Sequence, residues 1–292
     1  MKIIALLYFL LVSIISFGQS KDQKLESQIC ELIKGYNGDI GIHVLNLSNG
    51  KTASYNADSL FPTASMVKLP ILLGVMDKIK TGELKDTQNL VYTDSLLYEG
   101  VDILGSFKNG EKIELGKVVM LMLTMSDNTA SLWLQSLAGT GTRINQILDS
   151  LGFQFTRINS RTPGRELNRN EYGWGQTTPR EMVMFMQKMY NRELVSPQIS
   201  EKMLKLTSRN FWDDVAHSSI PPGIFVSSKN GAVNASRSEV LLVYGKSPYI
   251  FCVCTKNNKD TSWESNNEAW VLTRKLSELI WERYGRDKKH IK

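Results

Sequence analysis

The stretch Phe61-Pro62-Thr63-Ala64-Ser65-Met66-Val67-Lys68 stands where the chain changes from strand-like to helix-like sequence. Before it, residues 40–47 and 51–55 alternate as β-strands do, with Asn49-Gly50 in a hairpin turn between them. From residue 65 to about 209, apolar residues recur at helical spacing instead. Later segments are predicted as three further strands and a last amphipathic helix: 224–229, 239–244, 249–255 and 267–284.

This order predicts an α+β fold in which early and late strands share one antiparallel sheet flanked by the terminal helices. Residues 19–61 and 215–292 would form this discontinuous α/β domain, and residues 62–214 an inserted all-helical domain. We expect the active site in the cleft between the two domains, where ligand sites commonly lie.

Ser65 and Lys68 are the first candidate catalytic residues. Ser65 would begin a helix, at its positive end, and Lys68 would lie one turn later on the same face. A buried lysine near another cation loses its proton readily, so it can activate a serine without a histidine. Taken alone, the pair also fits an ordinary helix start with a surface lysine, because this spacing is expected about once by chance in such a chain.

Two further motifs each have a structural and a functional interpretation. Ser126-Asp127-Asn128 separates two apolar helices, so it either caps the second helix or points Ser126 and Asn128 into a cleft. Lys229-Asn230-Gly231-Ala232 follows a strand-like run, and Asn-Gly favours a turn there. The alternative is a strand in which Gly231 lets a ligand approach the backbone closely. The order and spacing of the three motifs together form a specific conjunction.

In these motifs the sequence resembles the class A β-lactamases and the related penicillin-recognising serine enzymes. The resemblance covers nearly all of the chain after residue 18. It includes Glu111-Lys112-Ile113-Glu114-Leu115 and the run Thr177-Thr178-Pro179-Arg180-Glu181-Met182, in which Thr178 to Glu181 read as a helix cap, a first-turn proline and a capping-box glutamate. It implies a serine hydrolase that opens a β-lactam through an acyl-enzyme on Ser65, without a metal or other cofactor.

The resemblance also implies catalytic roles. Ser65 would attack the lactam carbonyl, Lys68 would accept or relay its proton, and Ser126 would protonate the departing nitrogen. The backbone N–H groups of Ser65 and Ala232 would form an oxyanion hole, with Gly231 beside Ala232.

The remaining residues of the resemblance would hold the substrate. Asn128 would bind its side-chain amide, while Lys229 and Asn230 would face its carboxylate. Asn230 stands where the family has a threonine or serine, which puts the substrate preference in question. Arg237 would add a second cation for the carboxylate, or else be a surface residue of a strand.

The loop that should hold the hydrolytic water departs from the family. Class A enzymes have Glu-x-x-Leu-Asn there, whereas residues 161–170 read Arg-Thr-Pro-Gly-Arg-Glu-Leu-Asn-Arg-Asn. Matching Leu167-Asn168 puts Gly164 at the glutamate position, while matching Glu166 puts Arg169 at the leucine position. Glu166 is thus either the deacylation base or a surface carboxylate of the loop.

The N-terminal segment, the net charge and the cysteines indicate where the protein acts and which partners it is not expected to bind. Residues 1–18 have the charged start, apolar run and small residues of a signal peptide, so we expect a periplasmic or secreted protein with no membrane span after cleavage. The net charge of +6 is mild, and nothing in the sequence argues for nucleic acid. Cys30 either pairs with Cys252 or Cys254, or all three remain buried thiols.

Three functions follow from these patterns. The first is a β-lactamase-like hydrolase, expected to be a monomer, that acts on β-lactams or peptidoglycan-like compounds. The second is a penicillin-binding or peptidoglycan-peptidase-like protein with slow deacylation. The third is a non-catalytic cell-wall binding protein, which would have no need of the full set of candidate residues.

Overall fold

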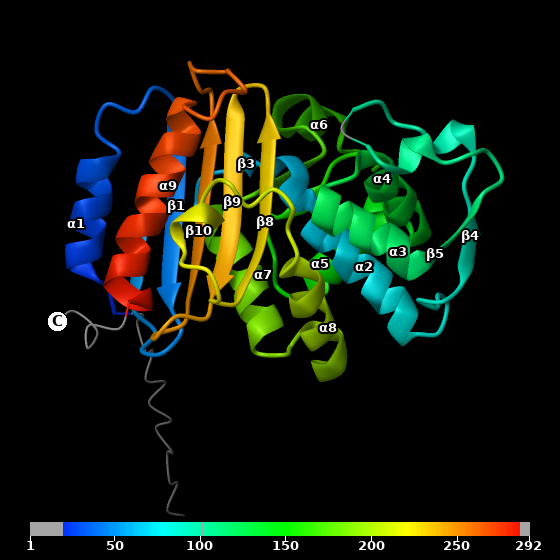
Figure 1. The fold of residues 1–292 in the computed structure, drawn as a ribbon, viewed down its shortest axis with the longest axis horizontal. Helices are drawn as coiled ribbons and strands as arrows, with labels where there is room; N and C mark the ends of the chain where they lie inside the picture. Colours follow the sequence, from blue (N-terminus) through cyan, green and yellow to red (C-terminus); the bar gives the residue numbers. More distant parts are fainter. Residues whose placement is uncertain (1–19, 101, 287–292) are drawn as a thin grey trace, which may run out of the picture.

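A five-stranded antiparallel sheet, in the order β2-β1-β10-β9-β8, forms the centre of the computed structural model, which describes residues 20–100 and 102–286 (Figure 1). The early hairpin joins the late strands because β1 pairs along its whole length with β10. The strands are β1 (Asp39–Asn46), β2 (Thr52–Tyr55), β8 (Val226–Val233), β9 (Ser236–Val243) and β10 (Tyr249–Lys256).

Each face of the sheet carries its own layer of helices. Helices α1 (Gln23–Leu32) and α9 (Glu268–Ile280) lie together on one face, and α7 (Pro179–Tyr190) crosses the other (Figure 1). The Asp22 carboxylate caps α1 and accepts two 2.9 Å hydrogen bonds from Arg283, just after α9. The predicted α+β class, with a sheet flanked by terminal helices, is confirmed.

Between residues 64 and 207 the chain is mainly helical. Helix α2 (Lys68–Lys80) is buried from Lys68 to Met76, because the other helices surround it and its apolar residues run all around the axis. Other helices of this region are η1 (Ala64–Val67), α3 (Leu115–Met120), η4 (Leu121–Met125), α4 (Asn128–Leu137), α5 (Thr140–Ser150), α6 (Glu166–Tyr172) and α8 (Pro197–Thr207).

The prediction that this region is all-helical is wrong in one respect, since it also holds two small sheets. One pairs β3 (Phe61–Pro62), β7 (Gly175–Thr177) and β6 (Arg157–Ile158); the other pairs β4 (Asn89–Val91) with β5 (Lys112–Glu114). Strands of two or three residues leave almost no alternating pattern in a sequence, so pattern analysis misses them.

Two local predictions are corrected. Asn230-Gly231 lies inside β8 rather than in a turn, and the chain turns between β8 and β9 at residues 234–235. Thr178 caps α7 as predicted, but Glu181 is not a capping-box residue. Its carboxylate instead accepts backbone hydrogen bonds from residues 154–156, whose N–H groups it satisfies.

The cysteines form no disulfide within the described residues. Cys30 is exposed on α1, whereas Cys252 and Cys254 are buried on one face of β10 with their sulfurs 3.7 Å apart. The buried-thiol interpretation therefore holds for the β10 pair and is wrong for Cys30.

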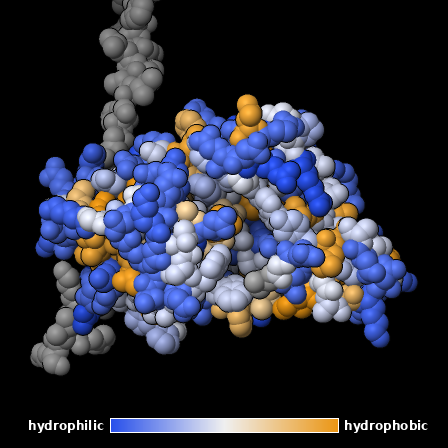
Figure 2. Space-filling view, turned by 90° about the horizontal axis from the view of Figure 1, so that it is seen from above, coloured by the Kyte–Doolittle hydropathy of each residue, from blue (hydrophilic) through white to orange (hydrophobic). Residues whose placement is uncertain are grey.

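The surface seen in Figure 2 is mostly hydrophilic, with apolar side chains in small separate groups. Within residues 20–100 and 102–286, none of the helices combines the length and the apolar character that crossing a membrane requires. The predicted signal peptide lies outside the described residues.

Candidate active site

Ser65 lies in the 3-10 turn η1, directly before helix α2, as the sequence predicts. Ala64, before it, has a positive φ of 42°, and Ser126, across the site, has a φ of 59°. Non-glycine residues rarely adopt this left-handed backbone, and such strain gathers at functional sites. Strained backbone therefore lies directly before Ser65 and at Ser126 itself, and the surrounding packing must hold it in position.

Lys68 is fully buried and links the first two motifs. Its Nζ lies 3.0 Å from Ser65 Oγ, 2.9 Å from Ser126 Oγ and 3.0 Å from Asn128 Oδ1, and it also contacts the carbonyl of Ser126. An ammonium has three protons for these four acceptors. One acceptor is therefore left without a proton while Lys68 is charged, and Ser65 Oγ becomes a donor when the amine is neutral.

Burial of the amine, reinforced by the nearby charge of Lys229, holds the pKa of Lys68 well below its ordinary value. Burial also lowers the pKa of Lys229 to about 7, against the opposing effect of Glu239. Lys229 is thus able to give up a proton near neutral pH, and Lys68 gives up its proton more readily than a surface lysine does.

Asp127, between the two site residues of its motif, has a structural role. Its carboxylate caps α4 through the N–H of Ala130 and accepts 2.8 Å hydrogen bonds from the N–H groups of Ile103 and Leu104. Burial and a hydrogen bond with Asp102 raise the pKa of Asp127 to about 6. The capping and the cleft interpretations of this motif are therefore both correct, for different residues.

Gly231 brings strand β8 against the serine. A Cβ at this position would lie 2.6 Å from Ser65 N and 2.7 Å from Thr63 O, so a glycine is required here. In this structure the close approach is to the backbone of the η1 turn. It sets the N–H of Ser65 and the strand residue Ala232 at the same cavity.

Lys229 and Asn230 lie together on β8. Lys229 Nζ donates to the carbonyl of Asn230 at 2.8 Å and to its Oδ1 at 3.1 Å. The Asn230 amide in turn donates to the carbonyl of Trp212 at 3.2 Å. Asn230 is thus oriented by both neighbours, a role that a threonine hydroxyl at this position would not fill in the same way.

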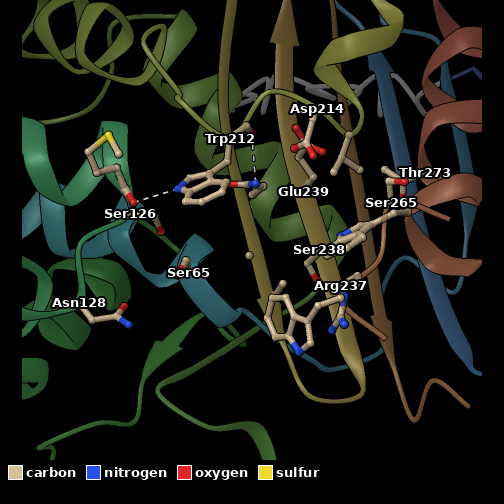
Figure 3. A pocket seen from close by; sticks show the side chains of 17 residues that line it. Ser65, Ser126, Asn128, Trp212, Asp214, Arg237, Ser238, Glu239, Ser265 and Thr273 are labelled. Atoms are coloured by element: carbon tan, nitrogen blue, oxygen red, sulfur yellow. Dashed lines mark hydrogen bonds between the residues drawn. The ribbon is translucent and has the colours of Figure 1, made fainter. Parts of the chain in front are cut away.

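A cavity of about 490 Å³ opens in front of these residues. Figure 3 shows Ser65, Ser126 and Asn128 on one side of it and Arg237, Ser238 and Glu239 on the strands at the other. The predicted site residues that line it are Ser65, Ser126, Asn128, Asn230, Gly231, Ala232 and Arg237.

Arg237 borders the cavity, but its surroundings differ from both predictions. It is 1% exposed, so it is not a surface residue. Its Nη1 and Nη2 donate to five backbone carbonyls, and its guanidinium lies 4.5 and 4.8 Å from the rings of Trp263 and Trp270. Through Nη1 and Nη2, Arg237 fastens the chain before α9, while its Nε has no hydrogen-bond partner among the described residues. Its role toward a substrate carboxylate stays a prediction.

Glu166 does not line the cavity. It is exposed at the start of α6, where the helix dipole favours a carboxylate, and it accepts a hydrogen bond from Gly164 N–H at 3.1 Å. Its neighbour Arg165 turns into the loop instead and donates to Asn159 and Gln176, at 2.7 Å each. This geometry gives no support to the prediction that Glu166 is the deacylation base.

Trp212 and Glu239 are two of the cavity residues that the sequence analysis missed. Trp212 donates from Nε1 to the carbonyl of Met125 at 3.0 Å, so the segment around it bridges the Ser126 loop and β8. Glu239 is a buried carboxylate on β9. A charged residue at the start of the apolar run 240–243 was a visible anomaly in the sequence, whereas nothing distinguished Trp212 from other exposed aromatics.

The fold places the protein among the β-lactamase/transpeptidase-like structures. The structure of PBP-A matches with a TM-score of 0.80 at 22% identity, over 91% of this chain and 97% of that one. An ancestral class A β-lactamase matches with a TM-score of 0.77 at 20% identity, over 89% and 100% of the two chains.

Sequence comparison then gives the family. Residues 24–284 match the model of the Beta-lactamase enzyme family, and the chain belongs to that family. Beta-lactamase PSE-4 of Pseudomonas aeruginosa is 24% identical, over 97% of this chain and 98% of its own. Beta-lactamase VEB-1 of the same organism is 26% identical over 66% of each chain. The resemblance to class A β-lactamases is thereby confirmed.

Proposed function

We propose that the protein opens β-lactams by forming an acyl-enzyme at Ser65. The observation that carries this proposal is the buried Lys68 amine, 3.0 Å from Ser65 Oγ and 2.9 Å from Ser126 Oγ. Both distances are within the reach required of a general base. Family membership supports action on β-lactams, and a mutant of the fold relative PBP-A is described as an acyl-enzyme complex with penicillin-G.

In the proposed reaction, neutral Lys68 takes the proton of the Ser65 hydroxyl as Oγ attacks the lactam carbonyl. The N–H groups of Ser65 and Ala232 stabilise the oxyanion. The lactam C–N bond then breaks, Ser126 gives its proton to the nitrogen, and Lys68 returns a proton to Ser126. The sum is one new ester bond and one new N–H, with Lys68 neutral again.

The substrate is held on both sides of Ser65. Asn128 takes its side-chain amide, and Lys229 and Asn230 face its carboxylate. Lys229 is suited to this role in its protonated form, and burial already weakens its hold on that proton.

A second candidate is a penicillin-binding protein with the same acylation and slow deacylation. The outward position of Glu166 favours it, because no carboxylate of residues 161–170 lines the cavity to activate a water. In either case we expect export through cleavage after residue 18, a periplasmic or secreted monomer, and domains divided near residues 61 and 214.

Two substrates test the proposal on the purified mature protein. A fluorescent penicillin should label wild type and the control Ser59→Ala, an exposed serine, but leave Ser65→Ala unlabelled. A chromogenic cephalosporin then separates the candidates, since sustained turnover indicates a β-lactamase and a stable one-to-one label a penicillin-binding protein. Absence of any label on wild type, with cell-wall fragments bound equally by Ser65→Ala, would instead indicate the non-catalytic binding protein.

A further inference from the structure

The cavity continues from Ser65 across the outer face of β8 and β9. The strand register pairs Asn230 with Glu239 and Ala232 with Arg237, so these four side chains share one face. Trp270 and Thr273 line the same cavity from α9, and Asp214 lines it from the segment before β8 (Figure 3). Apart from Asn230 and Ala232, the residues of this outer part have no role in the proposed acylation.

Glu239 is the unusual group in this part of the cavity. It is 1% exposed, and Oε2 accepts a 2.9 Å hydrogen bond from the N–H of Ala216. Oε1 has no hydrogen-bond partner among the described residues. Oε1 is itself buried, and the backbone N–H groups of Ala216 and His217 both act on this carboxyl group to lower its pKa, against the larger effect of burial.

Asp214 adds a second carboxylate beside the first. It is exposed, it lines the cavity, and Figure 3 draws it next to Glu239. Burial raises the pKa of Glu239 to about 7. The charge of Asp214 adds a smaller effect in the same direction, and the charge of Lys229 opposes it. Two neighbouring carboxylates repel an anion and attract a cation.

No ion pair joins Asp214 or Glu239 to the nearest cationic side chains of the described residues. Arg237 shares the face, but backbone carbonyls and two indoles surround its guanidinium. Lys229 pairs in register with Val240, on the opposite face from Glu239, and donates to Asn230. Three tryptophans also line the cavity and offer apolar surface to an aliphatic chain: Trp212, Trp263 and Trp270.

We propose that Asp214 and Glu239 form an acidic subsite that binds the primary ammonium at the end of a peptide side chain. The aliphatic part of that side chain would pack on the indoles, and the ammonium would lie against the paired carboxylates of Asp214 and Glu239. This inference rests on the proposed function, since it adds an amine-bearing peptide side chain to the substrate class of that site.

A matched pair of probes tests the subsite without any acylation. Nα-acetyl-lysine methylamide and Nα-acetyl-norleucine methylamide differ only in the ammonium, and the binding of each is measured by calorimetry. Wild type and Ser65→Ala should bind the lysine probe at least about tenfold more tightly, the ratio expected when a charge is paired in a partly buried site. Labelling by fluorescent penicillin is measured separately, so a failure of acylation is distinct from a failure of this subsite.

Variants locate the effect. Glu239→Gln should bring the two affinities within about twofold, and the exposed Asp214→Asn should reduce the preference about threefold without risk to folding. Asp213→Asn, an exposed neighbour that does not line the cavity, should keep the full preference. Equal binding of both probes to wild type, or a preference that survives both Glu239→Gln and Asp214→Asn, overturns the proposal.

Discussion

The Lys68 cluster and the loop 161–170 contain the two halves of the expected reaction, and they are built very differently. Lys68 is fully buried with four acceptors around its Nζ, whereas Glu166 is exposed and bonds within its own loop. A buried network holds its members in one geometry, while an exposed side chain is free to turn. The contrast indicates that the proposed acylation and deacylation would depend on separate parts of the fold.

The largest effect is expected at Lys68. Lys68→Met should slow labelling of Ser65 by about 10²–10⁴-fold, because the general base is gone. Lys68→Arg should be similarly slow, since an arginine keeps the charge but does not deprotonate. The labelling rate of wild type should rise with pH as the amine loses its proton, at a pH below the ordinary 10.5. A wild-type labelling rate in Lys68→Arg would show that Lys68 is not the general base.

The next effect is expected at Gly231. Gly231→Ala would push β8 away from Ser65 N, and a displacement of about 1 Å at a reacting group costs roughly 10²-fold in rate. Gly116→Ala is the matched control, because its Cβ would meet its nearest neighbour at an ordinary 3.4 Å. The labelling rates of the two variants are measured side by side. A slow Gly231→Ala and an unchanged Gly116→Ala would show that the close contact between β8 and Ser65 is what labelling requires.

A smaller effect is expected from Glu239, on the pH dependence of the free energy of unfolding. Its pKa is raised from 4.5 to about 7 in the folded protein, so the folded state binds more protons between these values. Stability should therefore fall as pH rises from 4.5 to 7, by an amount on the order of 2–3 kcal/mol from this group. Urea unfolding at pH 5 and pH 7 should show a weaker fall in Glu239→Gln and an unchanged one in Asp213→Asn. Parallel slopes in all three proteins would contradict this assignment.

The smallest effect is expected at Glu166. Glu166→Gln should change hydrolysis of a chromogenic cephalosporin by less than about twofold, as surface substitutions usually do. Steady-state rates and the lifetime of the labelled protein measure it. A loss of tenfold or more in the hydrolysis rate would contradict this prediction. Loop 161–170 would then have to move toward Ser65 in the acyl-enzyme, and the contrast between the two regions would hold only for the free protein.

The sequence by itself determined the fold class and the residues around Ser65. Strand alternation, helical spacing and the Asn49-Gly50 turn are local patterns that depend on neighbours along the chain. The Ser65, Ser126 and Lys229 motifs were recognisable because their order and spacing are specific even where each one alone is not.

Tertiary structure alone decided what surrounds each candidate. Glu166 and Arg165 are adjacent in sequence, yet packing turns one outward and the other into the loop. Arg237 is held in place because two tryptophans and the carbonyls of Thr261 and Ser262 meet it from a distant segment, in addition to three carbonyls of its own hairpin. The charge and hydrogen-bonding state of a side chain depends on groups distant in the chain, and local sequence carries no record of which of them folding brings near.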